Sequence, residues 1–448
     1  MTFHHLSSLK MLGAPLVGYA VRRPFDRGRA NRCLVRDIRA MGPTYVKIAQ
    51  FIASRGDVFD PDLTTELQVL QDQNVLDGFD SMDIIRAEVS DVLVDAEPFA
   101  GASLSVVHRG KYEGREVAVK VKRPNLEAEL RRDIQNLREL LLLLSFRSNV
   151  RDTLGILNEA ERYLMEEIDF AREAENSIRY KETAPAYVRI PEVYAVSENV
   201  MIQEYIEGTR VDSPPNGIDS RKLARYLLYS QFDSVMRGFF HGDTHGGNIL
   251  VDPSGRLVLL DFGLCVDIGG NEVKESLTCL LKALVDRNVD AFYENLVSQN
   301  VIVLNSGCTP SDVKRYLKIF FVFLERPIEK IDVEELRVLE NSRSFRFTYP
   351  WILAFKTIAS LEGIAIKVAD VRIRDVVEEY GKTRLTDMTG VPRQNILGTV
   401  QKLVTVPGTL VGLDNDLSDL SSSLKSSEKQ TQNLLKALFV LDIILHFL

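Results

Sequence analysis

The stretch His241–Gly263 reads HGDTHGGNILVDPSGRLVLLDFG and is the most informative part of the chain. Two short apolar runs flank the turn Asp252–Gly255, in which proline and glycine favour a tight hairpin. A hairpin of this kind puts Asn248 at one mouth and Asp261 at the other. An amide oxygen and a carboxylate suit Mg²⁺, which takes one or two protein ligands and completes its shell with phosphate and water. The sequence therefore predicts a magnesium site with Asn248 and Asp261 as ligands.

Asp243 precedes Asn248 by five residues. In the catalytic loop of protein kinases, an aspartate at this spacing orients or deprotonates the attacking hydroxyl. The tripeptide DFG at 261–263 is by itself common at a strand end and indicates little. Joined to the pattern HxDxxxxN and to a hairpin, it resembles the catalytic segment of a kinase-type fold. Asp243 is therefore the candidate catalytic aspartate.

Length and charge limit the classes of protein that fit. A chain of 448 residues exceeds the size at which a single core stops growing, so two or three structural units are expected. The formal charge of -8 argues against general nucleic-acid binding. Residues 1–50 nevertheless hold nine Lys/Arg against two Asp, so the remainder carries -15. This basic N-terminal patch fits contact with an acidic lipid surface, contact with an acidic face of the same protein, or a solvated helix face.

The four cysteines form no CxxC pair and have no histidine at ligand spacing, which favours reduced thiols in a reducing compartment without zinc. The apolar stretch 9–21 is too short to span a bilayer, and no segment reaches about eighteen uncharged apolar residues, so no spanning helix is expected. A cleaved signal or an Arg-rich presequence ending before Asn31 is an open alternative.

The region upstream contains the elements of a phosphate-binding lobe. Strand alternation over Val117–Lys122 puts three valines on one face and Lys120 on the other, where a kinase lysine holds the α- and β-phosphates. There is no GxGxxG motif. The residues 100–103 form a turn whose backbone N–H groups could bind phosphate oxygens instead. Glu204 begins the run EYIEG, at the place where a kinase hinge presents backbone groups to adenine. The candidate nucleotide contacts in the turn are Ala100, Gly101, Ala102 and Ser103.

Two charged segments complete the candidate site. Residues 31–73 read as two helices joined at Gly42-Pro43, with Lys47 and Gln50 one turn apart. Residues 127–182 read as strongly helical, and the segment EEIDFAREAEN within them carries several carboxylates. Taken alone, each segment would be a solvated charged face. The carboxylates are Glu167, Asp169 and Glu173.

Together these motifs resemble the UbiB/ADCK (AarF-domain) family of atypical kinases. Lys47 and Gln50 match its KxGQ signature, with Ala49 where the family has glycine. Residues 100–103 are similar to its alanine-rich loop, with Gly101 replacing the middle alanine and Val106 replacing a glutamine. Glu167 and Asp169 match its ExD element, and Glu173 matches its helix αC glutamate. The resemblance implies that Glu173 pairs with Lys120 and that Lys47 contacts Glu167 or Asp169.

The resemblance implies an α+β, bilobal protein-kinase-like fold with a helical N-terminal extension and a helix-rich C-lobe. The expected divisions are a targeting or flexible segment 1–30, the helical extension 31–95, an N-lobe 96–208 with the ExD helix insert, and a C-lobe 209–390. A C-terminal part, 391–448, would hold a helix, a polar linker and an apolar helix that either docks on the domain or lies in a membrane interface. No long activation segment or APE motif follows Gly263, which points away from phosphorylating proteins in trans.

The chain departs from the family pattern at Thr244 and Gly246, where prolines are usual. The groups needed for chemistry are all retained, which favours an active enzyme over a pseudokinase. As a hypothesis, Gly101 makes the phosphate-binding turn more permissive of ATP. Three further elements are expected from pattern alone: a helix near Met82–Val94, a strand at Ile190–Tyr194, and a helix over Arg221–Phe240.

Three functions remain open. The first is an atypical kinase or ATPase using ATP or ADP with Mg²⁺ in ubiquinone or other prenylquinone lipid biosynthesis. Its partners would be a prenylquinone-type lipid, an anionic membrane surface, a second copy of the chain or quinone-biosynthesis proteins, and its location intracellular and peripheral to a membrane. The second is a small-molecule kinase of the aminoglycoside or choline type, which HGDTHGGN also resembles but which lacks the Lys47–Gln50 and ExD elements. The third is a non-catalytic, nucleotide-gated lipid or protein scaffold.

Overall fold

The computed structural model describes residues 26–53, 79–101, 104–143, 150–269, 286–305, 307–323 and 344–373, with a few single positions outside them. Helices and strands both occur throughout these ranges, which confirms the α+β class. The segment before residue 26 largely lies outside the described residues, as do the C-terminal part 391–448 and the turn residues Ala102 and Ser103. The chain divides into two compact units, Met1–Gly208 with Val258–Leu264, and Thr209–Leu257 with Cys265–Leu448.

The first unit contains an antiparallel sheet of six strands. The strand order is β1-β3-β4-β7-β6, and β2 pairs with β3. A further short strand, β5 (Val188–Arg189), precedes β6 in the chain. The sheet consists of β1 (Val92–Val94), β2 (Ala100–Gly101), β3 (Ser105–Tyr112), β4 (Arg115–Lys122), β6 (Val193–Val196) and β7 (Val200–Glu204).

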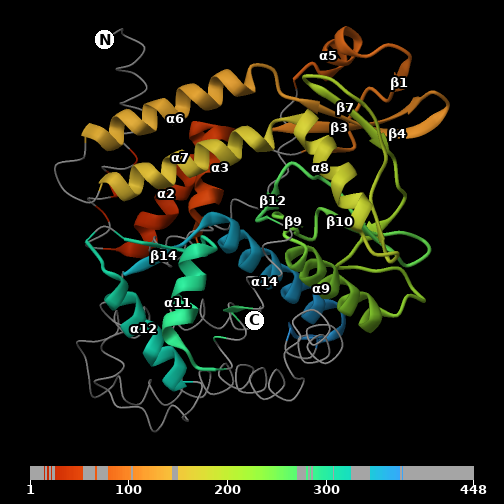
Figure 1. Cartoon of the computed structure of the whole chain (residues 1–448). Coiled ribbons are helices and arrows are strands. Elements are labelled where there is room, and N and C mark those ends of the chain that lie inside the picture. The colour runs from red at the N-terminus through yellow and green to blue at the C-terminus, as the bar shows by residue number, and fades with distance from the viewer. Residues whose placement is uncertain are drawn as a thin grey trace. The chain divides into compact units, whose positions relative to one another are not determined.

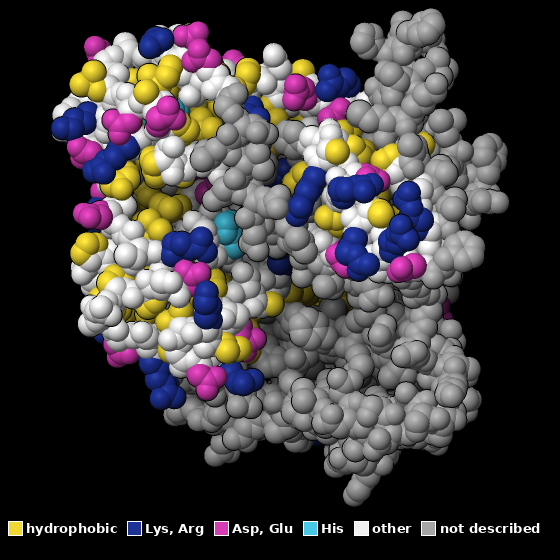
Figure 2. Space-filling view, turned by 180° about the vertical axis from the view of Figure 1, so that it is seen from behind, with side chains coloured by type: hydrophobic (Ala, Val, Ile, Leu, Met, Phe, Trp, Pro, Cys, Tyr) yellow, Lys and Arg dark blue, Asp and Glu magenta, His cyan; other side chains and the backbone are white. Residues whose placement is uncertain are grey.

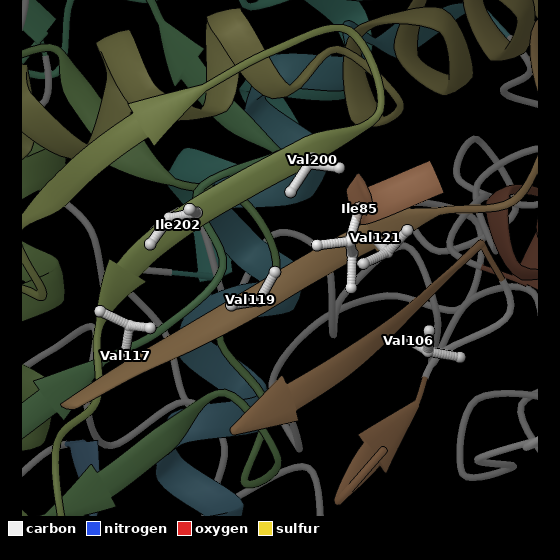
Figure 3. Close-up of a cluster of buried hydrophobic side chains, with 7 residues drawn as sticks. All are labelled: Ile85, Val106, Val117, Val119, Val121, Val200 and Ile202. Atoms are coloured by element: carbon white, nitrogen blue, oxygen red, sulfur yellow. The ribbon is translucent and has the colours of Figure 1, made fainter. Parts of the chain in front are cut away.

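One face of this sheet is a hydrophobic core. Val117, Val119 and Val121 of β4 are fully buried, as the alternation predicts. They pack with side chains of β3 and β7 and with Ile85 of helix α5 (Ser81–Glu88), as Figure 3 shows. Because successive side chains alternate, Ala118 and Lys120 point to the opposite face. The core thus fixes which side of the sheet is available for chemistry.

Six helices of the first unit are described. Helices α6 and α7 run side by side, with α3 against both (Figure 1). Apolar side chains from all three, including Ile48, Leu130 and Leu164, form one buried cluster. Gly42, at φ 114, joins α2 to α3 in a backbone conformation that favours glycine. Besides α5, the helices are α2 (Arg27–Met41), α3 (Pro43–Ala53), α6 (Leu126–Leu143), α7 (Val150–Glu167) and α8 (Phe170–Thr183).

Two expectations for this unit need correction. The helix expected at Met82–Val94 ends at Glu88, because Asp91 takes a left-handed conformation with φ 61 and the following residues pair with β3 as β1. The strand expected at Ile190–Tyr194 begins only at Val193. Pro191 has no backbone N–H to donate to a strand ladder, so pairing starts beyond it.

The second unit is mainly helical in its described part. Helix α14 (Tyr349–Ala369) packs along α9 (Ser220–Met236), as Figure 1 shows. The helix expected over Arg221–Phe240 ends at Met236, since Gly238 has φ 77 and the chain then forms β9 (Phe239–His241), which pairs with β12. The other elements beyond Gly208 are α11 (Val289–Ser298), α12 (Pro310–Phe323), β8 (Thr209–Arg210), β10 (Ile249–Val251), β11 (Leu257–Leu259), β12 (Cys265–Asp267), β13 (Ile302–Leu304) and β14 (Phe345–Phe347).

The turn between β10 and β11 has the chemistry expected of a tight turn. Asp252 is buried, and its carboxylate accepts hydrogen bonds from Ser254 and from the backbone and side chain of Arg256. Gly255 has φ 82 and donates to the Asp252 carbonyl at 2.9 Å. Hydrogen bonding lowers the pKa of Asp252 despite its burial, which raises it. The turn predicted at Asp252–Gly255 is present.

Basic side chains collect on the exposed face of α2. Arg29, Arg32, Arg36 and Arg39 are exposed, whereas Leu34 and others on the opposite face are buried. Figure 2 shows Lys and Arg side chains gathered over this part of the first unit, with acidic ones interspersed. In the part of the chain that the structure describes, no helix has the length and apolar character needed to cross a bilayer.

Candidate functional site

Lys120 lies at the centre of a charged cluster in the first unit. Its Nζ atom is 2.8 Å from both carboxylate oxygens of Glu173 and 3.2 Å from Oδ2 of Asp261. The side chains of Lys120 and Glu173 are 12% and 2% exposed, whereas that of Asp261 is 41% exposed. The structure therefore brings together three predicted residues from β4, α8 and the DFG segment, and one of them remains open to solvent.

Helix α8 holds the DFG segment. The backbone N–H of Phe262 donates to Oε1 of Glu173 at 3.3 Å, and Nδ2 of Asn176 donates to the Phe262 carbonyl at 3.0 Å. The rings of Tyr180 and Phe262 lie 5.3 Å apart. Because these contacts come from successive turns of one helix, α8 fixes both the backbone and the side chain of Phe262.

The charges in this cluster are strongly coupled. Burial by itself would lower the pKa of Lys120, but the charges of Asp261 and Glu173 raise it. Burial raises the pKa of Glu173 to about 7, although Lys120 counteracts this shift. Lys120 also lies 5.4 Å from the centroid of the Phe170 ring. The ammonium is thus held in its charged form at a fixed position, as phosphate binding requires.

Asp261 is the group of this cluster that could hold a metal. It has φ 55, a left-handed conformation that aspartate adopts more often than most other residues, and its Oδ1 accepts a hydrogen bond from the Gly263 N–H at 3.2 Å. With both carboxylates ionised, the three charges carry one excess negative charge, which a divalent cation can offset. The described residues contain no group of three or more His, Cys, Asp or Glu that could hold a metal. Mg²⁺ bound through a carboxylate and substrate phosphates does not require one.

The KxGQ-like segment meets the end of α7. Lys47 of α3 forms an ion pair with Glu167, and the two side chains are 16% and 25% exposed. Asp169 does not join this pair; it is the N-cap of α8 and accepts from the Arg172 N–H at 3.1 Å. Gln50 lies half-buried one turn along α3, and Ala49 is buried between α2 and neighbouring side chains.

Glu167 also adjoins the DFG segment. A Cβ atom added to Gly263 would lie 3.3 Å from the carbonyl oxygen of Glu167 and 3.3 Å from Oδ1 of Asp261. Glycine at this position therefore allows the DFG segment to approach the end of α7. Lys47 is connected through Glu167 to the segment that carries Asp261.

The structure describes part of the candidate phosphate-binding turn. Gly101 belongs to β2 and pairs opposite Val106. Alanine can adopt the extended backbone conformation of a strand. The ring of Phe99 lies 5.9 Å from that of Tyr205, with the Arg109 guanidinium 4.4 Å from the Tyr205 centroid. This aromatic and cationic group lies next to the turn.

The side chain of Glu204 is occupied by structural contacts. It accepts from Nη2 of Arg189 at 2.5 Å and from the Glu192 N–H at 3.2 Å, and its own N–H donates to the Glu192 carbonyl. A role in adenine binding can therefore come only from its backbone carbonyl or from neighbouring residues. Gln203 of β7 was not among the predicted residues. It pairs opposite Ala118, so its side chain lies on the sheet face that carries Lys120. The pairing of β7 with β4 is the feature that would have pointed to it.

The candidate catalytic loop, residues 241–248, belongs to the second unit. The N–H of Asp243 donates to Nδ1 of His241 at 3.1 Å, and Nδ2 of Asn248 donates to the Asp243 carbonyl at 3.2 Å. This use of the amide nitrogen leaves the amide oxygen of Asn248 as the atom that could meet a metal. Nζ of Lys356 in α14 lies 3.3 Å from Oδ1 of Asp243. Sequence reasoning missed Lys356, because 113 residues separate it from Asp243.

Comparison with known proteins agrees with the geometry. A family model described as ABC1 atypical kinase-like domain matches residues 91–296. The chloroplastic protein Activity of BC1 complex kinase 8 from Arabidopsis thaliana is 32% identical over 334 residues, covering 69% of this chain and 43% of that protein. An uncharacterized chloroplastic aarF domain-containing protein kinase from the same plant is 28% identical over 351 residues, covering 73% and 49%. The chain belongs to the UbiB/ADCK family.

A further relative comes from an organism that is not a plant. An uncharacterized protein of Synechocystis is 25% identical over 432 residues, covering 90% of this chain and 73% of that protein. The chain spans less than half of the length of the first plant relative, Activity of BC1 complex kinase 8. Among solved structures, a Mycobacterium tuberculosis protein in complex with erythromycin has a TM-score of 0.44 and 23% identity, covering 62% of this chain and 74% of that one. That likeness is too weak to bear on function.

Proposed function

We propose that this UbiB/ADCK family member is an atypical kinase or ATPase that binds Mg-ATP and acts in prenylquinone lipid metabolism at a membrane surface. The observation that carries the proposal is the Lys120 ammonium held between the buried Glu173 and the exposed Asp261. That arrangement suits a nucleotide whose phosphates replace part of the Lys120–Asp261 contact. The two compact units would be the lobes of a kinase-like fold, and helices α2 and α3 would belong to its N-terminal extension.

Each group then has a role in phosphoryl transfer. Lys120, positioned by Glu173, would bind the α- and β-phosphates. Asp261 and Asn248 would hold Mg²⁺, which when bound neutralises charge developing on the phosphates. Asp243 would orient the acceptor hydroxyl or water and take its proton. The backbone of the turn at 100–103 would contact phosphate oxygens, and the chain beside Glu204 would contact adenine.

The membrane part of the proposal is supported by charge. The exposed arginines of α2 would bind anionic lipid headgroups, and each basic residue near such a surface adds roughly 1 kcal/mol. The Lys47–Glu167 pair next to the DFG segment would give the N-terminal helices an influence on the nucleotide site. The lipid substrate, a second copy of the chain and quinone-biosynthesis proteins are the partners that this proposal implies.

Mg-ATP turnover tests the proposal. Purified protein is expected to hydrolyse ATP, with stimulation by anionic vesicles that contain a prenylquinone analogue. Asp261→Asn should abolish turnover, and Lys47→Ala should alter its response to vesicles. Tight nucleotide binding without turnover, even on vesicles, would instead support the scaffold function. Phosphorylation of an added hydroxyl metabolite without lipid stimulation would support a small-molecule kinase.

A further inference from the structure

A lysine of α14 that is not among the predicted site residues lies beside the candidate catalytic aspartate. Lys356 lies in α14, and its Nζ atom is 3.3 Å from Oδ1 of Asp243. The two side chains are 31% and 35% exposed, so the pair lies at an accessible part of the second unit rather than in its core. A bound substrate can therefore reach the same carboxylate.

The position of Lys356 is set by buried contacts of its helix. The adjacent residue, Thr357, is 1% exposed and accepts a hydrogen bond from Nε2 of Gln231 at 2.8 Å. Gln231, on α9, is equally buried and also lies 3.4 Å from the carbonyl oxygen of His241. Thr357, Gln231 and His241 thus tie α14 to the start of the catalytic loop. Lys356 is brought to Asp243 by this fixed framework rather than by a chance surface encounter.

The backbone N–H and carbonyl of Asp243 both form hydrogen bonds within the loop, whereas its carboxylate contacts Lys356 of α14. His241 accepts from the Asp243 N–H, and Asn248 donates to the Asp243 carbonyl. His245 accepts the Gly247 N–H at Nδ1, at 3.0 Å, which leaves the proton of a neutral ring on Nε2. That Nε2 lies 4.0 Å from Oδ2 of Asp243, beyond hydrogen-bonding distance. Lys356 therefore contacts Oδ1, and Oδ2 is the carboxylate oxygen nearer His245.

We propose that Lys356 is a positioning residue for phosphoryl transfer, an inference that rests on the proposed function. Its ammonium orients the Asp243 carboxylate toward the acceptor hydroxyl, and it offsets the charge of that carboxylate, which weakens its repulsion of the negative phosphoryl group. The acceptor oxygen forms a bond to the γ-phosphorus as the bond from that phosphorus to the bridging oxygen breaks. The electron pair of the broken bond leaves with ADP, and the acceptor proton passes to the Asp243 carboxylate. Lys356 exchanges no proton.

Steady-state kinetics of Lys356→Met and Lys356→Arg test this role. Because Lys356 acts on the acceptor side, Lys356→Met should lower kcat by about 10- to 100-fold and change KM for ATP by less than about threefold. Lys356→Arg should recover most of kcat. The matched control is Lys367→Met, which removes an exposed lysine of the same helix that pairs with Asp212 at 3.3 Å, and it should stay within about twofold of the parent.

A double-mutant cycle with Asp243→Asn separates action through the aspartate from an independent effect. Adding Lys356→Met to Asp243→Asn should cause little further loss. An equal loss in both backgrounds would overturn the inference, as would a parent-like kcat for Lys356→Met. A parent chain that turns over no ATP would refute the proposed function and this inference together, whereas an active parent with an indifferent Lys356 would refute the inference alone.

Discussion

Thr244 has a buried hydroxyl that makes no hydrogen bond to the described residues. Its side chain is 4% exposed. A buried hydroxyl without a partner retains the cost of losing water. The family pattern has proline here, which carries no hydroxyl, so the local structure suits an apolar side chain.

Thr244→Val is therefore expected to stabilise the chain. The valine keeps the shape of threonine and removes the unpaired hydroxyl, which should raise the free energy of unfolding by about 1 kcal/mol. Thermal denaturation of the variant and the parent measures the difference. A lower melting temperature for Thr244→Val would mean that the hydroxyl has a partner in the folded protein.

Glu173 gives a pH dependence of stability. Burial raises the pKa of Glu173 to about 7, from an ordinary value of 4.5. Between these two values the folded chain retains a proton that the unfolded chain has released, so this group's contribution to stability falls as pH rises. The parent should lose on the order of 2 kcal/mol relative to Glu173→Gln between pH 5 and 7.5. Denaturant titrations at several pH values measure this, and parallel pH profiles would contradict it.

Individual site residues differ in how far the sequence could predict them. The face of β4 on which Lys120 lies follows from alternation with buried valines. Its pairing with Glu173, 53 residues away, followed only from the family resemblance, since distance along the chain carries no contact information. Nothing in the sequence around Lys356 marks this lysine as a site residue. Its contact with Asp243 depends on how α14 packs on α9.

At the scale of elements, the pair between α3 and α7 is the most informative contact. Lys47 and Glu167 are both largely buried, so leaving either charge alone has a desolvation cost. Lys47→Glu should therefore destabilise the first unit by about 2 kcal/mol, and the swapped pair Lys47→Glu with Glu167→Lys should recover at least half of that loss. Chemical denaturation of the three variants measures the recovery.

An exposed pair in the same unit provides the control. Arg131 and Glu127 of α6 are 59% and 62% exposed and lie four residues apart. Arg131→Glu should change stability by less than about 0.5 kcal/mol, because solvent screens such pairs. If the swapped Lys47/Glu167 variant were no more stable than the single one, packing rather than charge would connect α3 with α7.

Secondary structure was predictable where local chemistry agrees with tertiary packing. The strand expected at Val117–Lys122 is present as β4, which begins two residues earlier, at Arg115. The alternation of its valines coincides with their burial. The helix expected at Met82–Val94 was too long, since nothing in its apolar pattern marks Asp91 as left-handed. The helix expected at Arg221–Phe240 was also too long. Phe239–His241 is apolar enough for either state, and pairing with β12 selects the strand.

At the scale of the whole molecule, the proposed function depends on groups that the chain contributes from distant segments. The first unit holds Lys120, Glu173 and Asp261 together, and the second holds Asp243 with Asn248 and Lys356. Under the proposed function, the first set would supply a cation and a metal ligand, and the second a carboxylate that orients the acceptor together with the lysine beside it. The proposed chemistry requires both sets.

The central claim is that the Lys120–Glu173–Asp261 cluster is a Mg²⁺-dependent nucleotide site, and isothermal titration calorimetry with ATP tests it most directly. The parent and the control Asp83→Asn, which changes an exposed carboxylate of α5, should bind ATP in the presence of Mg²⁺ and at least tenfold more weakly when EDTA removes it. Asp261→Asn should bind ATP at least tenfold more weakly with Mg²⁺ and show little dependence on the metal. Equal, metal-dependent binding by the parent and Asp261→Asn would contradict the account.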